Sequence, residues 1–83
     1  MSYERIKAAK KRTVGTRETT KAVQKGLARV VFIAKDAEPH VTEPLVSLCR
    51  EKGVEVIMVD SMRELGRACG IEVSSASAAI LEE

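Results

Sequence analysis

Three charged residues near the start of a predicted helix could recognise a polar ligand. Arg17, Glu18 and Lys21 follow Gly15 and Thr16, and we expect Thr16 to cap the helix N-terminus. Arg17 and Lys21 are four residues apart and share one face of the helix, with Glu18 beside both. The set combines two donors with one acceptor. It can therefore hydrogen-bond to a ligand that presents both kinds of group.

A second segment, far away in the sequence, could add apolar contacts. Ile71, Glu72 and Val73 follow Gly70 in a predicted loop of residues 71–74. Apolar side chains in a loop are not required by a helix or a strand, so they can form an interaction surface. The alternative is that Ile71 and Val73 are buried in the core.

Positive charge is concentrated in the first third of the chain. The net charge is +2, but residues 1–29 carry nine lysine or arginine residues against two acids, a balance of +7. Residues 30–83 carry five basic residues against ten acids, a balance of −5. This asymmetry suits a polyanion bound at one face, because local positive charge speeds the encounter and supplies phosphate contacts. A solvated amphipathic helix with incidental lysines would give the same pattern.

The composition indicates one folded domain without a cofactor or metal. The 83 residues support a single domain, 1–83, with one modest core. Cys49 and Cys69 have no CxxC spacing, so we expect reduced structural thiols, and we expect His40 on a surface loop. The N-terminus has no signal-peptide pattern and no segment is long enough to span a membrane. We therefore expect a cytoplasmic protein. We also expect a monomer.

The residue pattern predicts alternating helices and strands. The expected helices cover residues 3–11, 16–25, 45–52 and 61–70, and the expected strands cover residues 13–14, 29–34 and 54–59. Pro39 and Pro44 are expected to bracket the entry to the third helix, which ends at Gly53. Residues 75–81 fit either a strand or a helix. Such an alternation is typical of an α/β protein, specifically a three-layer α/β/α sandwich.

Single residues refine these elements. In the second helix Ala22, Val23 and either Thr19 or Thr20 should face inward, which leaves the charged residues outward. Ser61 and Glu64 form a capping box at the start of the fourth helix. The uninterrupted apolar run 30–33 indicates a central strand buried on both faces, and we expect residues 54–59 to be central too.

The two segments together resemble the kink-turn-binding ribosomal protein family. They read Gly-Thr-Arg-Glu-Thr-Thr-Lys from residue 15 and Leu-Gly-Arg-Ala-Cys-Gly-Ile-Glu-Val from residue 65. This family includes the archaeal large-subunit protein L7Ae, the eukaryotic protein L30e and short bacterial YbxF-type proteins, which this chain resembles most in length. The resemblance implies that residues 75–81 form a strand, giving a small mixed sheet of about four strands. It also implies a ribonucleoprotein partner, with kink turns in ribosomal RNA or riboswitches as the ligand.

The resemblance assigns roles to the charged residues. A kink turn is a sharply bent RNA internal loop with sheared G·A pairs, and the bend makes base edges accessible in the major groove. Arg17 and Lys21 would donate to the O6 and N7 atoms of guanine, and Glu18 would accept from exocyclic amino groups. The family usually has asparagine where this chain has Arg17, so the contact at that position is expected to differ.

The remaining site residues flank these contacts. Ile71 and Val73 would cover an unstacked nucleotide, with Glu72 between them, and Gly15 and Thr16 would form the helix start that faces the RNA. Arg63 is a further candidate for a phosphate contact, as is Arg67. These positions complete the expected RNA-binding set.

Two other classes of function fit less well. The segment 66–70 lacks the spacing and the preceding strand of a nucleotide-binding loop, and no nucleophile and base are paired, so we do not expect an enzyme. A small protein-interaction or assembly subunit that does not bind nucleic acid is the alternative. Binding that resists added salt would favour this alternative over RNA.

Overall fold

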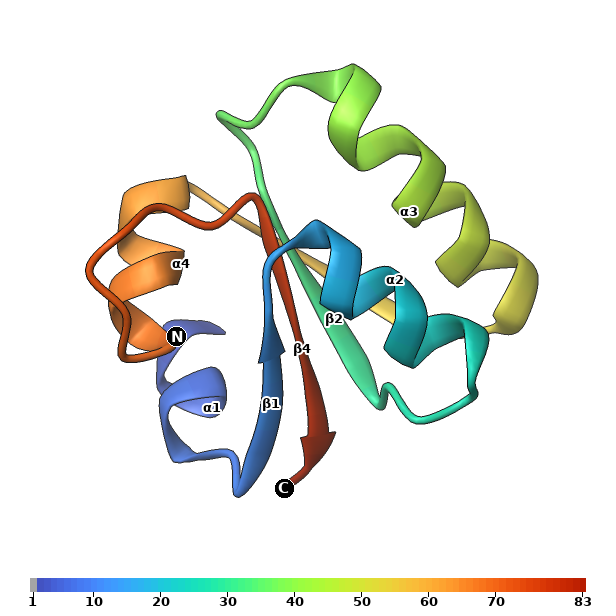
Figure 1. Cartoon of the computed structure of the whole chain (residues 1–83), viewed down its shortest axis with the longest axis horizontal. Helices are drawn as coiled ribbons and strands as arrows, with labels where there is room; N and C mark the ends of the chain where they lie inside the picture. The colour runs from blue at the N-terminus through green and yellow to red at the C-terminus, as the bar shows by residue number, and fades with distance from the viewer. Residues whose placement is uncertain (1) are drawn as a thin grey trace.

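A mixed four-stranded sheet forms the centre of the molecule, in the strand order β1-β4-β2-β3. The computed structural model describes residues 2–83. The helices are α1 (Ser2–Ala8), α2 (Thr16–Gln24), α3 (Pro39–Lys52) and α4 (Met62–Ala68), and the strands are β1 (Lys11–Val14), β2 (Val30–Ala34), β3 (Glu55–Val59) and β4 (Ser77–Glu82). β2 and β3 pair in parallel, whereas β4 is antiparallel to both β1 and β2. The helices lie on both sides of the sheet (Figure 1).

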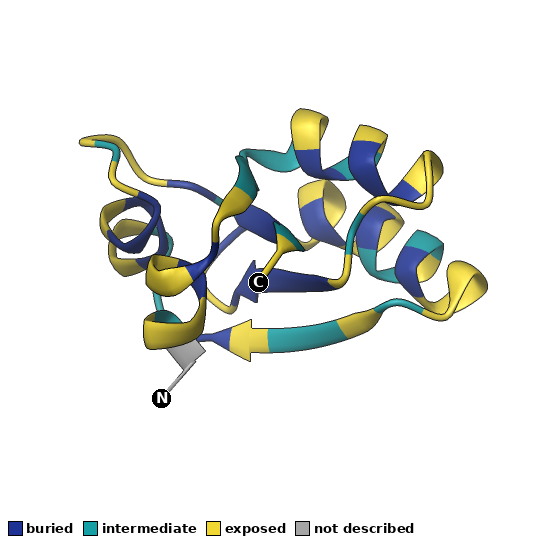
Figure 2. Ribbon diagram, turned by 90° about the horizontal axis from the view of Figure 1, so that it is seen from below, coloured by how far each residue is buried: buried dark blue, intermediate teal, exposed yellow. Residues whose placement is uncertain are grey.

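Each face of the sheet is covered by one pair of helices. Phe32 and its alternate neighbours in β2 pack with Ile6 of α1 and Leu65 of α4. Ile33 points to the other face and packs with Val23 of α2 and Leu45 of α3. All five residues of β2 are buried, whereas the edge strands β1 and β3 are mostly intermediate or exposed, as Figure 2 shows by colour. The predicted three-layer α/β/α sandwich is confirmed, and so is the predicted strand near residues 75–81.

The fourth strand in sequence order is central, and β3 is not. We expected residues 54–59 to be a central strand, but β3 lies at an edge of the sheet, and Met58 is 47% exposed. The predicted central position is therefore wrong. It rested on the apolar residues of β3, but an edge strand that packs against helices can be as apolar as a central one. β4 takes the central place with small residues such as Ala78 and Ala79.

Several element boundaries also differ from those predicted. α3 begins at Pro39, and Pro44 lies inside it, so His40 is an exposed helical residue rather than a loop residue. Pro44 lacks one amide donor, yet the helix continues to Gly53, whose positive φ of 72° closes its C-terminus as predicted. α1 ends at Ala8, and β1 is longer than the expected strand.

The N-cap of α4 and the two thiols agree with the sequence predictions. The Ser61 hydroxyl accepts from the Glu64 amide at 3.1 Å, although the Ser61 amide donates to the Tyr3 hydroxyl rather than to Glu64. Cys49 and Cys69 are buried and free, and burial raises the pKa of both thiols, which favours the neutral form. Within residues 2–83, no helix is both long and apolar enough to cross a bilayer.

Candidate nucleic-acid interface

The N-terminus of α2 is held by hydrogen bonds to β4 that the sequence does not predict. Thr16 is the first helical residue and not the N-cap. Its hydroxyl pairs instead with that of Ser77 at 2.9 Å. Gly15 occupies the cap position at φ 94°, a value that only glycine adopts readily, and no side chain caps the helix. The expected Thr16 cap is therefore wrong, because β4 uses the hydroxyl that a cap would need.

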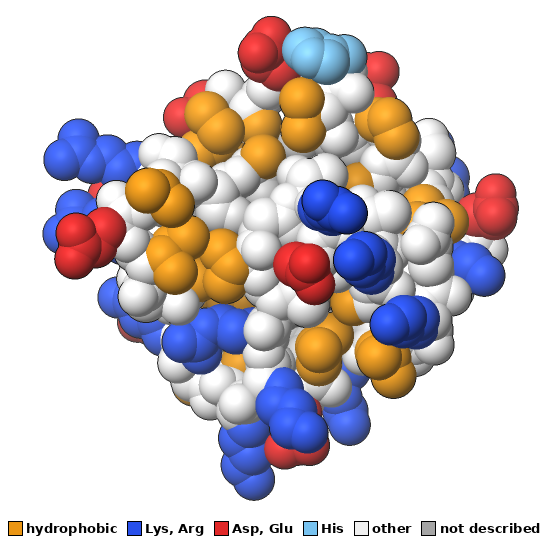
Figure 3. Space-filling model, in the orientation of Figure 1, with side chains coloured by type: hydrophobic (Ala, Val, Ile, Leu, Met, Phe, Trp, Pro, Cys, Tyr) orange, Lys and Arg blue, Asp and Glu red, His pale blue; other side chains and the backbone are white. Residues whose placement is uncertain are grey.

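The charged residues of α2 face solvent. Thr19, Ala22 and Val23 are buried against the sheet, as predicted, and this orients Arg17, Glu18 and Lys21 outward. None of these three charged side chains forms an ion pair or a hydrogen bond within residues 2–83. A row of basic side chains, with an acidic one beside it, crosses the face of the molecule over α2 (Figure 3).

The loop of residues 71–74 is anchored to α4 at both ends. The Ile71 amide donates to the Gly66 carbonyl at 3.1 Å, and the Ser75 amide donates to the Met62 carbonyl at 3.0 Å. Between these anchors Val73 is 69% exposed, so the alternative of a core position is wrong for this residue. Ile71 is half-buried, so it is neither a core residue nor fully exposed. Glu72 is exposed. The loop thus presents apolar surface on a fixed backbone.

A cluster of hydroxyl groups joins this loop to the start of α2. The Gly15 amide donates to the Ser77 carbonyl at 2.9 Å and lies 3.1 Å from the Ser75 hydroxyl oxygen. The Ser75 hydroxyl in turn donates to the Ser77 carbonyl at 2.6 Å. We did not single out Ser75 or Ser77 from the sequence. The signal was a run of small residues alternating with serine, which allows backbone and hydroxyl groups to approach closely.

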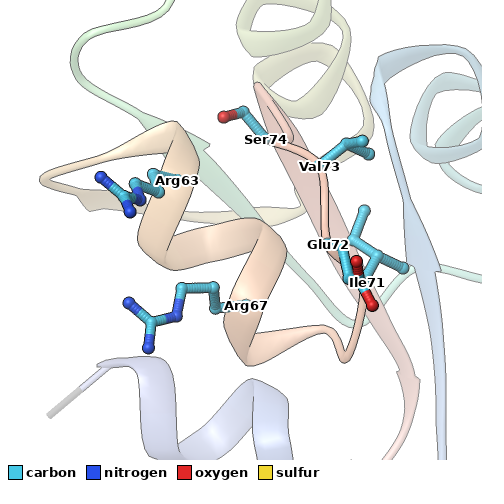
Figure 4. Close-up of a pocket in the computed structure, with 6 residues that line it drawn as sticks. All are labelled: Arg63, Arg67, Ile71, Glu72, Val73 and Ser74. Atoms are coloured by element: carbon cyan, nitrogen blue, oxygen red, sulfur yellow. The ribbon is translucent and has the colours of Figure 1, made fainter.

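Arg63 and Arg67 lie on α4 and border an open hollow of about 500 Å³. Ile71, Glu72, Val73 and Ser74 form the rest of its wall. Figure 4 shows the two arginine side chains projecting from one side of α4, while the loop residues lie on the other side. Arg67 forms an exposed ion pair with Glu64 at 3.7 Å, which is weak enough for the guanidinium to change partners.

Not all of the basic N-terminal residues are available to a ligand. The Arg12 guanidinium donates to the carbonyls of Ile6, Ala9 and Cys69. Arg5 is paired with Glu83 at 2.8 Å. Arg12 thus joins the C-terminal ends of α1 and α4, and Arg5 holds the C-terminal residue against α1. Fewer basic side chains are therefore free to reach a ligand than the sequence suggests, although the Arg12 guanidinium keeps its charge.

The geometry suits a ligand bound by surface contact rather than one held in a closed cavity. Across residues 2–83, no group of three or more His, Cys, Asp or Glu side chains could hold a metal ion. What the surface offers is a charged helix start beside an exposed apolar loop. That combination matches a ligand with both polar edges and an exposed flat face.

The sequence and the structure are both similar to those of known RNA-binding proteins. The sequence profile of the ribosomal protein L7Ae/L30e/S12e/Gadd45 family matches residues 2–83. An RNA-binding protein of Bacillus pumilus (strain SAFR-032) is 43% identical over 81 residues, which cover 98% of this chain and 99% of the relative. The RNA-binding protein YbxF of Geobacillus stearothermophilus is 42% identical over 81 residues, with the same coverage. Among solved structures, the 15.5 kDa RNA-binding protein of Giardia lamblia has a TM-score of 0.86 and is 32% identical, covering 98% of this chain and 68% of that one.

Proposed function

Because this chain belongs to the ribosomal protein L7Ae/L30e/S12e/Gadd45 family, we propose that it binds structured RNA at kink turns and performs no catalysis. The similar proteins of Bacillus pumilus and Geobacillus stearothermophilus are RNA-binding proteins, which supports RNA binding by this chain. The ligand would be a kink turn in ribosomal RNA or in a riboswitch. The protein would act as a monomer, with the ribosome as one setting.

The observation that carries the proposal is the juxtaposition of two unlike surfaces. Three charged side chains on the outward face of α2, those of Arg17, Glu18 and Lys21, have no partner within the described residues, and the adjoining loop exposes Val73. A kink turn presents both base edges and an unstacked nucleotide, so it can use both surfaces at once, whereas a plain duplex can use neither well. The hydroxyl groups of Thr16, Ser75 and Ser77 fix the position of the loop relative to the start of α2.

Each residue then has a specific role. Arg17 and Lys21 donate to guanine acceptors, and Glu18 accepts from base amino groups. Gly15 and Thr16 bring the helix start close to the RNA. The apolar loop covers the unstacked nucleotide through Ile71 and Val73, with Glu72 at its tip, while Arg63 contacts backbone phosphate.

A competition between three RNAs tests this function. The first contains a kink turn, the second is a duplex of equal length, and the third is the kink turn with its G·A pairs replaced by Watson–Crick pairs. We expect the kink turn to bind at least about tenfold more tightly than either control at physiological salt, because the protein recognises shape as well as charge. Equal affinity for all three would overturn the assignment. Association with a protein partner that persists at high salt would favour the interaction-module alternative.

A further inference from the structure

Gly66 lies inside α4 and has no conformational reason to be glycine. The glycines at positions 15, 26, 53 and 70 all have positive φ angles, which explains their residue type, but Gly66 has ordinary helical geometry and is buried. Glycine in a helix interior is less favourable than alanine. Something other than the helix itself must favour glycine at this position.

The missing side chain makes room for the backbone of the loop. A Cβ atom on Gly66 would overlap the carbonyl oxygen of Val73, and it would lie 3.1 Å from the Val73 carbonyl carbon and 3.3 Å from the Ser74 Cα. Those atoms are backbone, so they cannot rotate away as a flexible side chain could. The loop therefore packs directly on α4, between the anchors formed by the Ile71 and Ser75 amides.

We infer that Gly66 is a positioning residue for RNA binding, which sets the height at which the loop holds Ile71 and Val73 above α4. This inference rests on the proposed function. Gly66 itself is buried and contacts no ligand. Its effect is to let the loop lie low enough for its apolar side chains to share one surface with the charged residues of α2.

Displacing the loop should affect binding far more than folding. Glu72, Val73 and Ser74 are exposed, so raising them removes little apolar surface from the core. Alanine also improves the helix propensity of α4, which offsets part of the cost of the overlap. An interface whose apolar side chains are displaced, by contrast, loses much of its affinity for the ligand.

The test compares Gly66→Ala with Gly53→Ala. Gly53 has a φ of 72° with no atom near its missing Cβ, so alanine there strains the end of α3 without touching the loop. We expect Gly66→Ala to lose about tenfold or more in kink-turn affinity while duplex binding is unchanged. Gly53→Ala should lower the melting temperature and leave kink-turn affinity of the folded protein within about twofold.

Two further readouts separate positioning from a structural role. Hydrogen exchange at the Ile71 and Ser75 amides should accelerate in Gly66→Ala and not in Gly53→Ala, because the loop anchors are lost. In a double-mutant cycle, Ile71→Ala should weaken kink-turn binding in the wild-type background and have little further effect in Gly66→Ala.

The outcomes are distinguishable. If wild-type protein discriminates between the RNAs and Gly66→Ala binds like wild type, the inference fails and the proposed function stands. Unchanged exchange at the two amides, or a Gly66→Ala chain that does not fold, would also overturn the inference. If wild-type protein does not discriminate, the proposed function fails, and with it the role of Gly66 in binding.

Discussion

The start of α2 and the loop of residues 71–74 form the two halves of the proposed interface, and the chain holds them in opposite ways. The residues of α2 are charged and sit on a regular helix whose buried face, with Ala22 and Val23, fixes their direction. The loop residues are apolar and sit on irregular backbone, fixed by anchors to another helix. The direction of the α2 side chains thus follows from the helix period, whereas the position of the loop follows from its packing against α4.

This difference predicts how each half should respond to substitution. Changes on α2 should act on individual hydrogen bonds and leave the backbone in place. Changes in the loop or beneath it should act on the position of the whole apolar surface. Substitutions in each half can test that contrast.

Glu18→Ala should reduce kink-turn affinity by about 1 to 3 kcal/mol, because the carboxylate accepts from base amino groups. Removing an acid from a protein that binds a polyanion should otherwise strengthen binding, so duplex affinity should stay the same or rise. Titration of both RNAs at one salt concentration measures the two effects. Glu43→Ala, which removes an exposed acid on α3, is the matched control and should change neither selectivity nor fold. Tighter kink-turn binding by Glu18→Ala would show that Glu18 is only an acid at the start of a helix.

Val73→Ala and Ile71→Ala should weaken kink-turn binding by about 1 kcal/mol each, through loss of apolar contact with the nucleotide. Their effects on stability should differ. Val73 is 69% exposed, so its truncation should cost within about 0.5 kcal/mol of unfolding free energy, and half-buried Ile71 should cost more. Thermal melts beside titrations measure both quantities. A large drop in melting temperature with normal affinity would remove the substituted residue from the site.

Ser77→Ala tests the join between the two halves. It removes the partner of the Thr16 hydroxyl and should lower the free energy of unfolding by about 1 kcal/mol. Adding Thr16→Ala to Ser77→Ala should cost little more, because the double variant leaves no unpaired hydroxyl in that pair. Denaturant titrations of the two single variants and the double variant give the coupling energy. Strictly additive losses would mean that the two hydroxyls do not act as a pair.

Lys7→Ala and Lys10→Ala should have the smallest effects. Both side chains are exposed. Each substitution should weaken binding to every RNA alike and reduce the slope of log affinity against log salt concentration by about one or less. Arg12→Ala provides the contrast, since its guanidinium binds three carbonyl groups. It should lower the melting temperature without changing the salt slope. A loss confined to kink turns in Lys7→Ala or Lys10→Ala would mean that these lysines recognise RNA structure.

The sequence predicted those features that depend on neighbours within one element. The inward face of α2, the Ser61 cap and the closure of α3 at Gly53 all follow from local residue types, and all are observed. The exposure of the charged α2 residues followed from the same reasoning. The family resemblance was needed to identify residues 75–81 as a strand, because their small residues have no decisive preference.

What the sequence could not supply involves contacts between different elements of the fold. The Thr16 hydroxyl could cap α2 or bond elsewhere, and only the pairing of β1 with β4 brings Ser77 to it. The edge position of β3 likewise depends on where β4 inserts. The sequence shows Gly66 only as part of the segment that resembles the family. Its close approach to the loop backbone is apparent only in the structure.

The central place of β4 also has a consequence for how the protein is made. β4 pairs with both β1 and β2, although it lies after every other strand in the sequence. A nascent chain that lacks residues 77–82 has only the β2–β3 pair of its sheet, and β1 has no neighbour. Contacts between segments so distant in sequence form late, since they carry a large loop-closure entropy. Ser75 and Ser77 arrive with that strand, so the ordered start of α2 should appear only once synthesis has passed residue 82.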